Sequence, residues 1–249
     1  MYELKGKTAL VTGASKRIGK AIALGLASQG TNVIIHYRKS EAEAEKVRGE
    51  IAALGAKSWL IKADLSDLAS CKRLMDQAYD RAGKIDILIN NASIFPLNKM
   101  SKIDTESLER EMSTNAWAPF TLGILLSEKT REGRIINLLD TRIAGYDFNH
   151  FSYYLSKRML EILTNSMALK QAPNITVNAV APGLILPPEG KDLNYLESKK
   201  GEVPLKRYGS VSDVVDAVLF LLKSDYITGQ VIFVDGGKHL IQTIEGLDA

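Results

Sequence analysis

The chain has 249 residues, 45% of them hydrophobic and 24% charged, which are ordinary values for a globular protein long enough to bury a sizeable core. Lys and Arg outnumber Asp and Glu by 32 to 29, and the basic residues are scattered, so we expect no nucleic-acid partner. The single cysteine, Cys71, excludes an intrachain disulfide, favours a reducing, cytoplasmic setting and is predicted to be a small core residue. No apolar run approaches the roughly 18 residues of a membrane span, and residues 1–5 lack the apolar segment of a signal peptide, so we expect no membrane partner.

A strand, a glycine turn and a helix open the chain. Residues 7–12 form a short apolar run that is predicted to be a buried strand, and an apolar helix over 21–27 ends near Gly30. Between them lie Gly13 and Gly19, with Arg17 at the place of the usual middle glycine. Backbone N–H groups and the positive end of a helix dipole at such a turn suit a pyrophosphate. The turn therefore predicts a dinucleotide site, and an ordinary turn is the alternative.

Strands and helices then alternate to the end of the chain. A capping-box pattern of Ser40 and Glu43 predicts the start of the next helix. The further strands are expected at 32–37, 57–62, 85–90, 134–139, 176–180 and 230–235, and the further helices at 40–55, 68–83, 105–113, 118–129, 153–171 and 211–222, with a less regular stretch at 183–202. This order predicts one α/β domain over 1–249 with a parallel sheet and helices on both faces.

Polar residues recur where the predicted strands end, and that edge of a parallel sheet is where ligands bind. The positions are Tyr37 to Ser40, Asp64, Asn90 to Ser93, Asp140, and Pro182 with Gly183. Taken singly, Asp64 suits a helix cap, Asn91 a turn residue, and Pro182 with Gly183 a plain turn. Their shared placement favours one common site.

The charge at the end of the second strand predicts the choice of cofactor. An acidic residue there would hold a ribose 2′-hydroxyl and repel a 2′-phosphate, and none lies between Val33 and Ser40. Arg38, Lys39 and the hydroxyl of Ser40 favour a phosphate. We therefore predict NADPH rather than NADH, the alternative being that Arg38 and Lys39 are solvated loop residues.

Asp140, Tyr153 and Lys157 suggest proton-coupled hydride chemistry. Tyr153 and Lys157 are four residues apart in a predicted helix and so share a face. An ammonium beside the phenol is expected to lower its pKa, whereas a carboxylate raises it. The pair would titrate as a coupled unit that suits a proton donor in the reductive direction.

These motifs resemble the short-chain dehydrogenase/reductase family over almost the full chain. The matching residues are Thr12, Gly13, Gly19, Asp64, Asn90, Asn91, Ala92, Asn115, Tyr153, Lys157, Pro182, Gly183 and 234–237. The resemblance implies a single-domain, doubly wound Rossmann fold with a seven-stranded parallel sheet. Arg17 for glycine and Asp140 for a serine that normally orients the substrate carbonyl, together with 36–40, 90–93 and Phe95, resemble the pteridine reductases, which reduce pterin or dihydropterin rings with NADPH.

The resemblance also implies residue roles. The cofactor would contact Gly13, Ser15, Arg17, Ile18, Gly19, Tyr37, Arg38, Lys39, Ser40, Asp64, Leu65, Asn91, Ala92, Ser93, Tyr153, Lys157, Pro182 and Gly183. Asp64 and Leu65 would lie by the adenine, Asn91 and Ala92 by its ribose, and Lys157 on the nicotinamide ribose. Asn115 would hold a water relay to the lysine, completing a catalytic set with Asp140, Tyr153 and Lys157.

The substrate would contact Arg17, Ser93, Phe95, Asp140 and Tyr153, beneath a covering segment at about 184–202. Phe95 would stack on the ring opposite the nicotinamide, and a core aromatic is its alternative. Arg17 would face both the substrate and the cofactor phosphate, and a phosphate-only contact is its alternative. No metal site is expected.

The implied activity is reduction of a pterin or dihydropterin, with dihydrofolate open as a substrate. The first alternative is an NADPH-dependent carbonyl reductase of an oxoacyl thioester or small ketone, against which Asp140 counts. The second is an NADPH-binding sensor without turnover, which would predict loss of Tyr153 or Lys157, and both are present. By resemblance the protein would be a homotetramer joined through its long central helices, which Leu160, Leu163 and Met167 permit.

Overall fold

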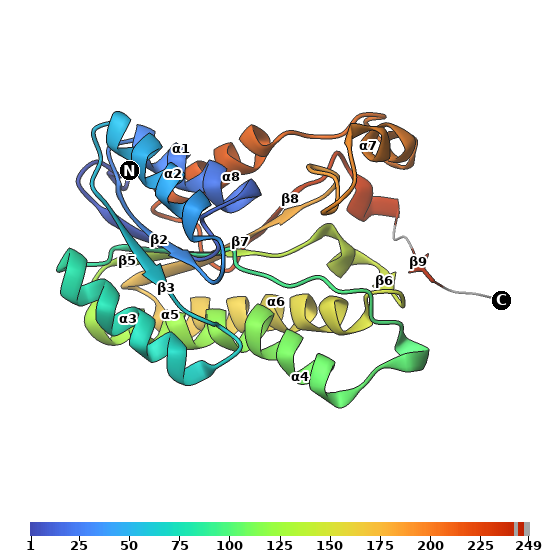
Figure 1. The fold of residues 1–249 in the computed structure, drawn as a ribbon, viewed down its shortest axis with the longest axis horizontal. Helices are drawn as coiled ribbons and strands as arrows, with labels where there is room; N and C mark the ends of the chain where they lie inside the picture. The colour runs from blue at the N-terminus through green and yellow to red at the C-terminus, as the bar shows by residue number, and fades with distance from the viewer. Residues whose placement is uncertain (242–243, 247–249) are drawn as a thin grey trace.

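The computed structural model describes residues 1–241 and 244–246, and its centre is one parallel sheet of seven strands in the order β3-β2-β1-β4-β5-β7-β8 (Figure 1). The strands are β1 (Thr8–Val11), β2 (Asn32–Tyr37), β3 (Ser58–Lys62), β4 (Ile87–Asn90), β5 (Gly133–Leu138), β7 (Ile175–Pro182) and β8 (Val231–Val234). The predicted α/β Rossmann fold with a seven-stranded parallel sheet is confirmed.

Helices cover both faces of the sheet. On one face lie α1 (Arg17–Ser28), α2 (Glu41–Ala53) and α8 (Val211–Lys223), and on the other lie α3 (Leu68–Ala82), α5 (Ala118–Lys129) and α6 (Phe151–Gln171), as Figure 1 shows. The side chains of β2 alternate accordingly, because Val33 and Ile35 join the core under α1 while Ile34 joins the core over α3. Cys71 is buried in this second core, and burial raises the pKa of its thiol to about 12.

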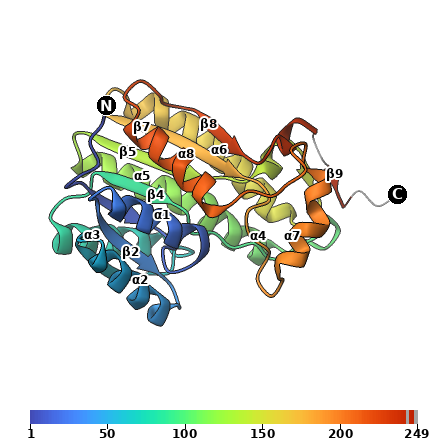
Figure 2. The same cartoon turned by 90° about the horizontal axis from the view of Figure 1, so that it is seen from above.

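The remaining helices, α4 (Thr105–Met112) and α7 (Leu193–Lys199), lie at the end of the molecule away from the N-terminus, which Figure 2 shows from above. The strands run from the N-terminal end of the sheet toward this end, so their carboxyl ends face α4 and α7. Helix α7 falls inside the 183–202 stretch that was expected to be irregular, and it is capped by Asp192, whose carboxylate accepts from Asn194 N at 3.1 Å. Among the described residues, no helix has the length and apolar character needed to cross a membrane.

The capping box predicted at Ser40 and Glu43 is wrong. The Ser40 side chain makes no cap hydrogen bond at the start of α2, and the Glu43 carboxylate pairs with Lys16 at 3.1 Å. The capping box in this chain opens α8, where Ser210 and Asp213 bond each other's backbone N–H groups.

Two further features were not predicted. A short two-stranded sheet joins β6 (Tyr146–Asp147) to β9 (Ile244–Glu245), beside the end of β5. Between α4 and α5 the chain makes a π-helical turn (Ser113–Trp117), which carries Asn115. Such turns occur often at functional sites.

Candidate active site

The turn after β1 is a tightly packed loop in which glycine is required at two positions. Gly13 has a positive φ of 63°, which glycine adopts without steric cost. A Cβ on Gly19 would lie 2.3 Å from the carbonyl oxygen of Gly13 and 2.4 Å from Nδ2 of Asn91. The glycines therefore let the start of α1 close onto the end of β1.

Thr12 and Asn91 fasten this turn to the end of β4. The Asn91 amide donates to the carbonyls of Thr12 at 2.9 Å and Gly13 at 3.1 Å. The hydroxyl of Thr12 accepts from the backbone N–H groups of Asn91 and Ala92 at 2.9 and 3.0 Å. Asn91 is thus a link between two strand ends rather than a residue of an isolated turn.

His36 completes the turn from β2, a role that the sequence did not predict. Its Nδ1 accepts from Gly13 N at 3.1 Å, and its Nε2 bonds the carbonyl of Ala63 at 3.2 Å. Burial lowers the pKa of His36 to about 4, so the ring is neutral at physiological pH. The only signal in the sequence was a histidine inside an apolar strand.

Arg17 occupies a backbone conformation typical of glycine, with φ 54°. Its Nη2 donates to the carbonyl of Pro187 at 2.7 Å, so it ties the glycine turn to the segment predicted to cover the substrate. Beside it lies a hollow of about 440 Å³ lined by Ser15, Lys16, Arg17, Lys20, Glu43, Lys46 and Glu189. Four cations against two carboxylates at the start of a helix suit the phosphates of a dinucleotide.

The end of β2 offers positive charge, as predicted. Arg38 is half-buried and Lys39 exposed, and Arg38 is one of the charges that lower the pKa of Asp64. Asp64 is not a helix cap: its carboxylate accepts from the N–H and hydroxyl of Ser66, and Asp67 caps α3 instead.

Other predicted cofactor residues are part of the protein core or of its turns. Tyr37 and Leu65 are buried in the two cores on either side of the sheet. Pro182 is the last residue of β7, and a Cβ on Gly183, which follows it, would lie 2.5 Å from Cβ of Asp235, directly after β8. The direct contacts of these residues with a cofactor stay predictions.

Asn115 clamps the segment after β4 onto α6. Its Oδ1 accepts from Ile94 N at 2.9 Å and from the hydroxyl of Ser93 at 3.2 Å. Its Nδ2 donates to the carbonyl of Ile94 and the hydroxyl of Ser156, both at 3.0 Å. The amide therefore positions Ser93, and its role in a water relay stays a prediction.

Asp140, Tyr153 and Lys157 meet at the end of β5. The hydroxyl of Tyr153 donates to Oδ2 of Asp140 at 2.9 Å. Nζ of Lys157 donates to the carbonyl of Leu138 at 2.7 Å and lies 5.6 Å from the centre of the Tyr153 ring. Lys157 is therefore held on the β5 backbone rather than on the phenol oxygen.

The electrostatics of this group correct one expectation. Burial first, and then the charge of Asp140, raise the pKa of Tyr153 well above its usual value of 10.0. Burial lowers the pKa of Lys157 to about 8, against the influence of Asp140. The expected lowering of the phenol pKa by Lys157 is wrong, the expected raising of it by Asp140 is confirmed, and Tyr153 keeps its proton at neutral pH.

Phe95 faces this group and is not a core aromatic. Its ring is 41% exposed, stacks on His150 with centres 4.0 Å apart, and meets Tyr153 edge-on at 4.5 Å. The guanidinium of Arg142 also lies over this ring, with Cζ 5.0 Å from its centre. The stacking of Phe95 on a substrate ring stays a prediction.

Comparisons with known proteins agree with this geometry. A family model described as enoyl-(acyl carrier protein) reductase matches residues 13–239. The chain belongs to the short-chain dehydrogenase/reductase family. It is 36% identical over 242 residues to the 3-oxoacyl-(acyl-carrier-protein) reductase FabG of Staphylococcus aureus (strain N315), with 94% of this chain and 98% of that protein covered. It is also 32% identical over 250 residues to L-rhamnose 1-dehydrogenase (NADP(+)) of Thermoplasma acidophilum, with coverage of 95% and 98%.

A solved structure of similar shape is FolM alternative dihydrofolate reductase 1 from Brucella suis in complex with NADP. It matches with a TM-score of 0.90 and 34% identity, over 96% of this chain and 97% of that one. The comparisons therefore include both a thioester reductase and a dihydrofolate reductase of the short-chain dehydrogenase/reductase family.

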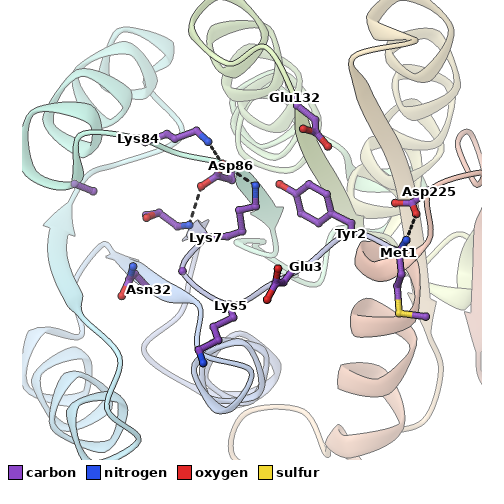
Figure 3. Close-up of a pocket in the computed structure, with 13 residues that line it drawn as sticks. Met1, Tyr2, Glu3, Lys5, Lys7, Asn32, Lys84, Asp86, Glu132 and Asp225 are labelled. Carbon is purple, nitrogen blue, oxygen red and sulfur yellow. Dashed lines mark hydrogen bonds and ion pairs between the residues drawn. The ribbon is translucent and has the colours of Figure 1, made fainter.

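Another hollow, of about 720 Å³, lies at the opposite end of the sheet (Figure 3). Asp86, which is buried there, accepts from Thr8 N at 3.0 Å and pairs with Lys84 and Lys7. These pairs fasten the start of β1 to the start of β4. Short-chain dehydrogenase/reductase chemistry belongs at the carboxyl ends of the strands, so we assign this hollow a structural role. Among the described residues, no group of three or more His, Cys, Asp or Glu side chains is placed to hold a metal.

Proposed function

We propose that the protein reduces a pterin or dihydropterin with NADPH. The observation that carries this is the 2.9 Å hydrogen bond from Tyr153 to Asp140, at the place where the resemblance puts a serine in carbonyl reducers. The similarity to the NADP-bound FolM alternative dihydrofolate reductase 1 supports the same class of substrate.

The residues present fit NADPH. A Cβ at Gly13 would lie 3.0 Å from Cα of Ala92, so glycine lets the turn after β1 pack against the end of β4, and the hollow beside Lys16, Arg17 and Lys20 suits the pyrophosphate. Arg38 and Lys39 at the end of β2 would hold the 2′-phosphate, and Lys157 the nicotinamide ribose. When bound, NADPH supplies the hydride that is added to carbon of a C=N bond.

The protein's own part is to place the substrate and supply one proton. Tyr153 is protonated at neutral pH and its O–H is aimed at Asp140, so the two groups hold a proton beside the exposed part of Phe95. The proton reaches the ring nitrogen from Tyr153 or Asp140, directly or through a water molecule, and balances the hydride. Ser93, fixed by Asn115, and Arg17, fixed by Pro187, would present polar groups to the substrate edge.

Reduction of a 3-oxoacyl thioester is the second candidate, and the 36% identity to FabG favours it. Against it stands Asp140, because a carboxylate beside Tyr153 repels the negative charge that develops on a carbonyl oxygen. A sensor without turnover is disfavoured because Tyr153 and Lys157 are both in place.

The deciding experiment follows NADPH oxidation with dihydrobiopterin, dihydromonapterin and dihydrofolate, in parallel with an acetoacetyl thioester. We expect turnover on a dihydropterin, and a fall of at least about 100-fold in kcat for Asp140→Ala and for Tyr153→Phe, since each removes part of the proton donor. NADPH binding, measured by its fluorescence, should be retained in both.

Tyr154→Phe is the matched control, because Tyr154 is the next residue of α6 and has no hydrogen bond to Asp140 among the described residues. Turnover on the thioester alone would refute the pterin proposal and make the protein a carbonyl reductase with an unusual site.

A tetramer joined through α5 and α6 belongs to this proposal. Leu160 and Met167, which were expected to permit it, are buried inside the single chain and cannot form the contact. Ile162 and Leu169 are the large apolar side chains that α6 exposes, and we propose that they meet the partner.

A further inference from the structure

One guanidinium group beside the site contacts three carboxylates. Arg142 lies two residues after Asp140, and its Nη1 is 3.5 Å from each oxygen of that carboxylate. Its Nε donates to Oδ2 of Asp147 at 2.8 Å, and its Nη2 lies 3.7 Å from Glu245. Its Cζ is 5.0 Å from the centre of the Phe95 ring. Neither the family resemblance nor the proposed mechanism gives Arg142 a role.

Asp147 is a fixed anchor for this guanidinium. It is fully buried, at 0% exposure, and accepts from the backbone N–H groups of Asn149 and His150, both at 2.9 Å. Nδ1 of His150 lies 3.1 Å from Oδ2 of Asp147, the oxygen that also accepts from Arg142. Burial alone would raise the pKa of Asp147, but the hydrogen bonds from His150 and the charge of Arg142 outweigh it, and the pKa is lowered. Arg142 is thus held against an anion that is rigid and ionised.

The outer side of Arg142 is closed by the C-terminal strand. Glu245 lies on β9, and its backbone carbonyl accepts from Phe148 N at 2.8 Å, which holds the strand beside β6. Its carboxylate also lies 3.8 Å from Nζ of Lys238. Although burial works against the charged form, Asp140 and Glu245 keep the pKa of Arg142 raised. The guanidinium therefore stays charged while the site works.

The Asp140–Tyr153 pair needs such a cation. When it gives up its proton, the two oxygens 2.9 Å apart carry added negative charge beside the carboxylate of Asp147. Lys157 is bonded to the Leu138 carbonyl instead. Among the residues that the structure describes, Arg142 is the one side chain that forms an ion pair with Asp140.

We propose that Arg142 is a positioning residue, which fixes the Asp140 carboxylate against Tyr153 and offsets the charge left when this pair releases its proton. The inference rests on the proposed function only in the choice of substrate, since either reduction needs the proton. The charged and titratable groups around the pair are Arg142 after β5, Asp147 on β6, His150, Lys157 on α6, and Glu245 on β9.

The test is the pH dependence of kcat/KM for the wild type and for Arg142→Met and Arg142→Lys. Loss of the cation favours the protonated pair, so the alkaline limb of the profile should move to higher pH by about one unit in Arg142→Met. Arg142→Lys keeps the charge, so its alkaline limb should return most of the way to the wild-type position, while its kcat stays below that of the wild type. The KM for NADPH should not change.

Asp147→Asn supplies an independent variant with the opposite sign. The amide oxygen still accepts from Arg142, but one negative charge near the pair is gone, so the limb should move to lower pH. Arg158→Met is the matched control: Arg158 also holds this segment, through the carbonyl of Ile143 at 2.8 Å, and pairs with Glu161 rather than Asp140. Its alkaline limb should stay where it is in the wild type.

A second measurement needs no turnover. In protein labelled with ¹³C at the aspartate carboxyl, the Asp140 signal is assigned by its loss in Asp140→Asn, and its titration midpoint should be higher in Arg142→Met than in the wild type. Absence of activity on every dihydropterin would refute the proposed function but would not affect this measurement of the Asp140 carboxyl. If both the alkaline limb of the kcat/KM profile and the carboxyl titration midpoint of Arg142→Met match those of the wild type, Arg142 has only a structural role and the inference is overturned.

Discussion

The cofactor turn (residues 12–19 with His36 and Asn91) and the proton cluster (Asp140, Arg142, Asp147, Tyr153 and Glu245) are held together by different forces. In the cofactor turn, neutral donors and acceptors meet at 2.9 to 3.1 Å, as in the bonds from Asn91 and to His36. In the proton cluster, one cation faces three carboxylates. Substitutions that change side-chain volume should therefore disturb the cofactor turn most, and changes of pH or of charge should disturb the proton cluster most.

Adding one methyl group to the cofactor turn should have the largest effect. In Gly19→Ala the new Cβ would lie 2.3 Å from the Gly13 carbonyl oxygen, which is backbone and must shift. We expect a loss of about 3 kcal/mol in the free energy of unfolding and loss of NADPH binding, measured by urea titration and by NADPH fluorescence.

Gly49→Ala on α2 is the control, because a Cβ at Gly49 meets nothing within 4 Å. It should stabilise the protein by up to about 1 kcal/mol. Equal behaviour of the two variants would mean that close packing does not define the cofactor turn.

The sequence predicted well those features whose constraints are local. Strand β2 was predicted at 32–37 and lies at Asn32–Tyr37, since its apolar run is bounded by turn residues on both sides. The pairing of Tyr153 with Lys157 on one helix follows from the helical repeat alone. Asp140 was placed correctly because it directly follows the predicted fifth strand.

What the sequence could not predict depends on neighbours distant in the chain. The role of His36 requires Gly13 and Ala63 to lie beside it, and the direction of Lys157 depends on the carbonyl of Leu138. Strands β6 and β9 have two residues each and lie about a hundred residues apart, so no periodicity marks them. Helix α7 buries little beyond Leu196, which leaves no amphipathic pattern to detect.

Removal of positive charge at the edge of the cofactor turn should have the second-largest effect. The double variant Arg38→Ala, Lys39→Ala removes two cations at the end of β2. Two charge-assisted hydrogen bonds contribute about 3 kcal/mol together, so NADPH should bind about 100-fold more weakly while NADH binding changes little.

Lys57→Ala is the control, because it removes one positive charge at the start of the neighbouring strand β3, away from the end of β2. Its affinity for NADPH and for NADH should equal that of the wild type. Equal weakening of NADPH and NADH in the double variant would show that Arg38 and Lys39 do not read the 2′-phosphate.

The smallest effect is expected at His36, whose imidazole accepts a hydrogen bond from the backbone of the cofactor turn. Burial lowers the pKa of His36 from 6.5 to about 4. Between these values the unfolded chain binds more protons than the folded one, so stability falls as the pH is lowered through this window. The loss attributable to His36 between pH 7 and pH 4.5 should be about 2 kcal/mol.

His36→Asn removes the titration and keeps an oxygen that accepts from Gly13 N. The free energy of unfolding of both proteins, measured by urea titration, should then depend differently on pH below pH 6.5 and equally between pH 7 and 8. Parallel slopes over the whole range would show that His36 has the same pKa in the folded and unfolded protein, and would contradict the conclusion that burial keeps its imidazole neutral in the cofactor turn.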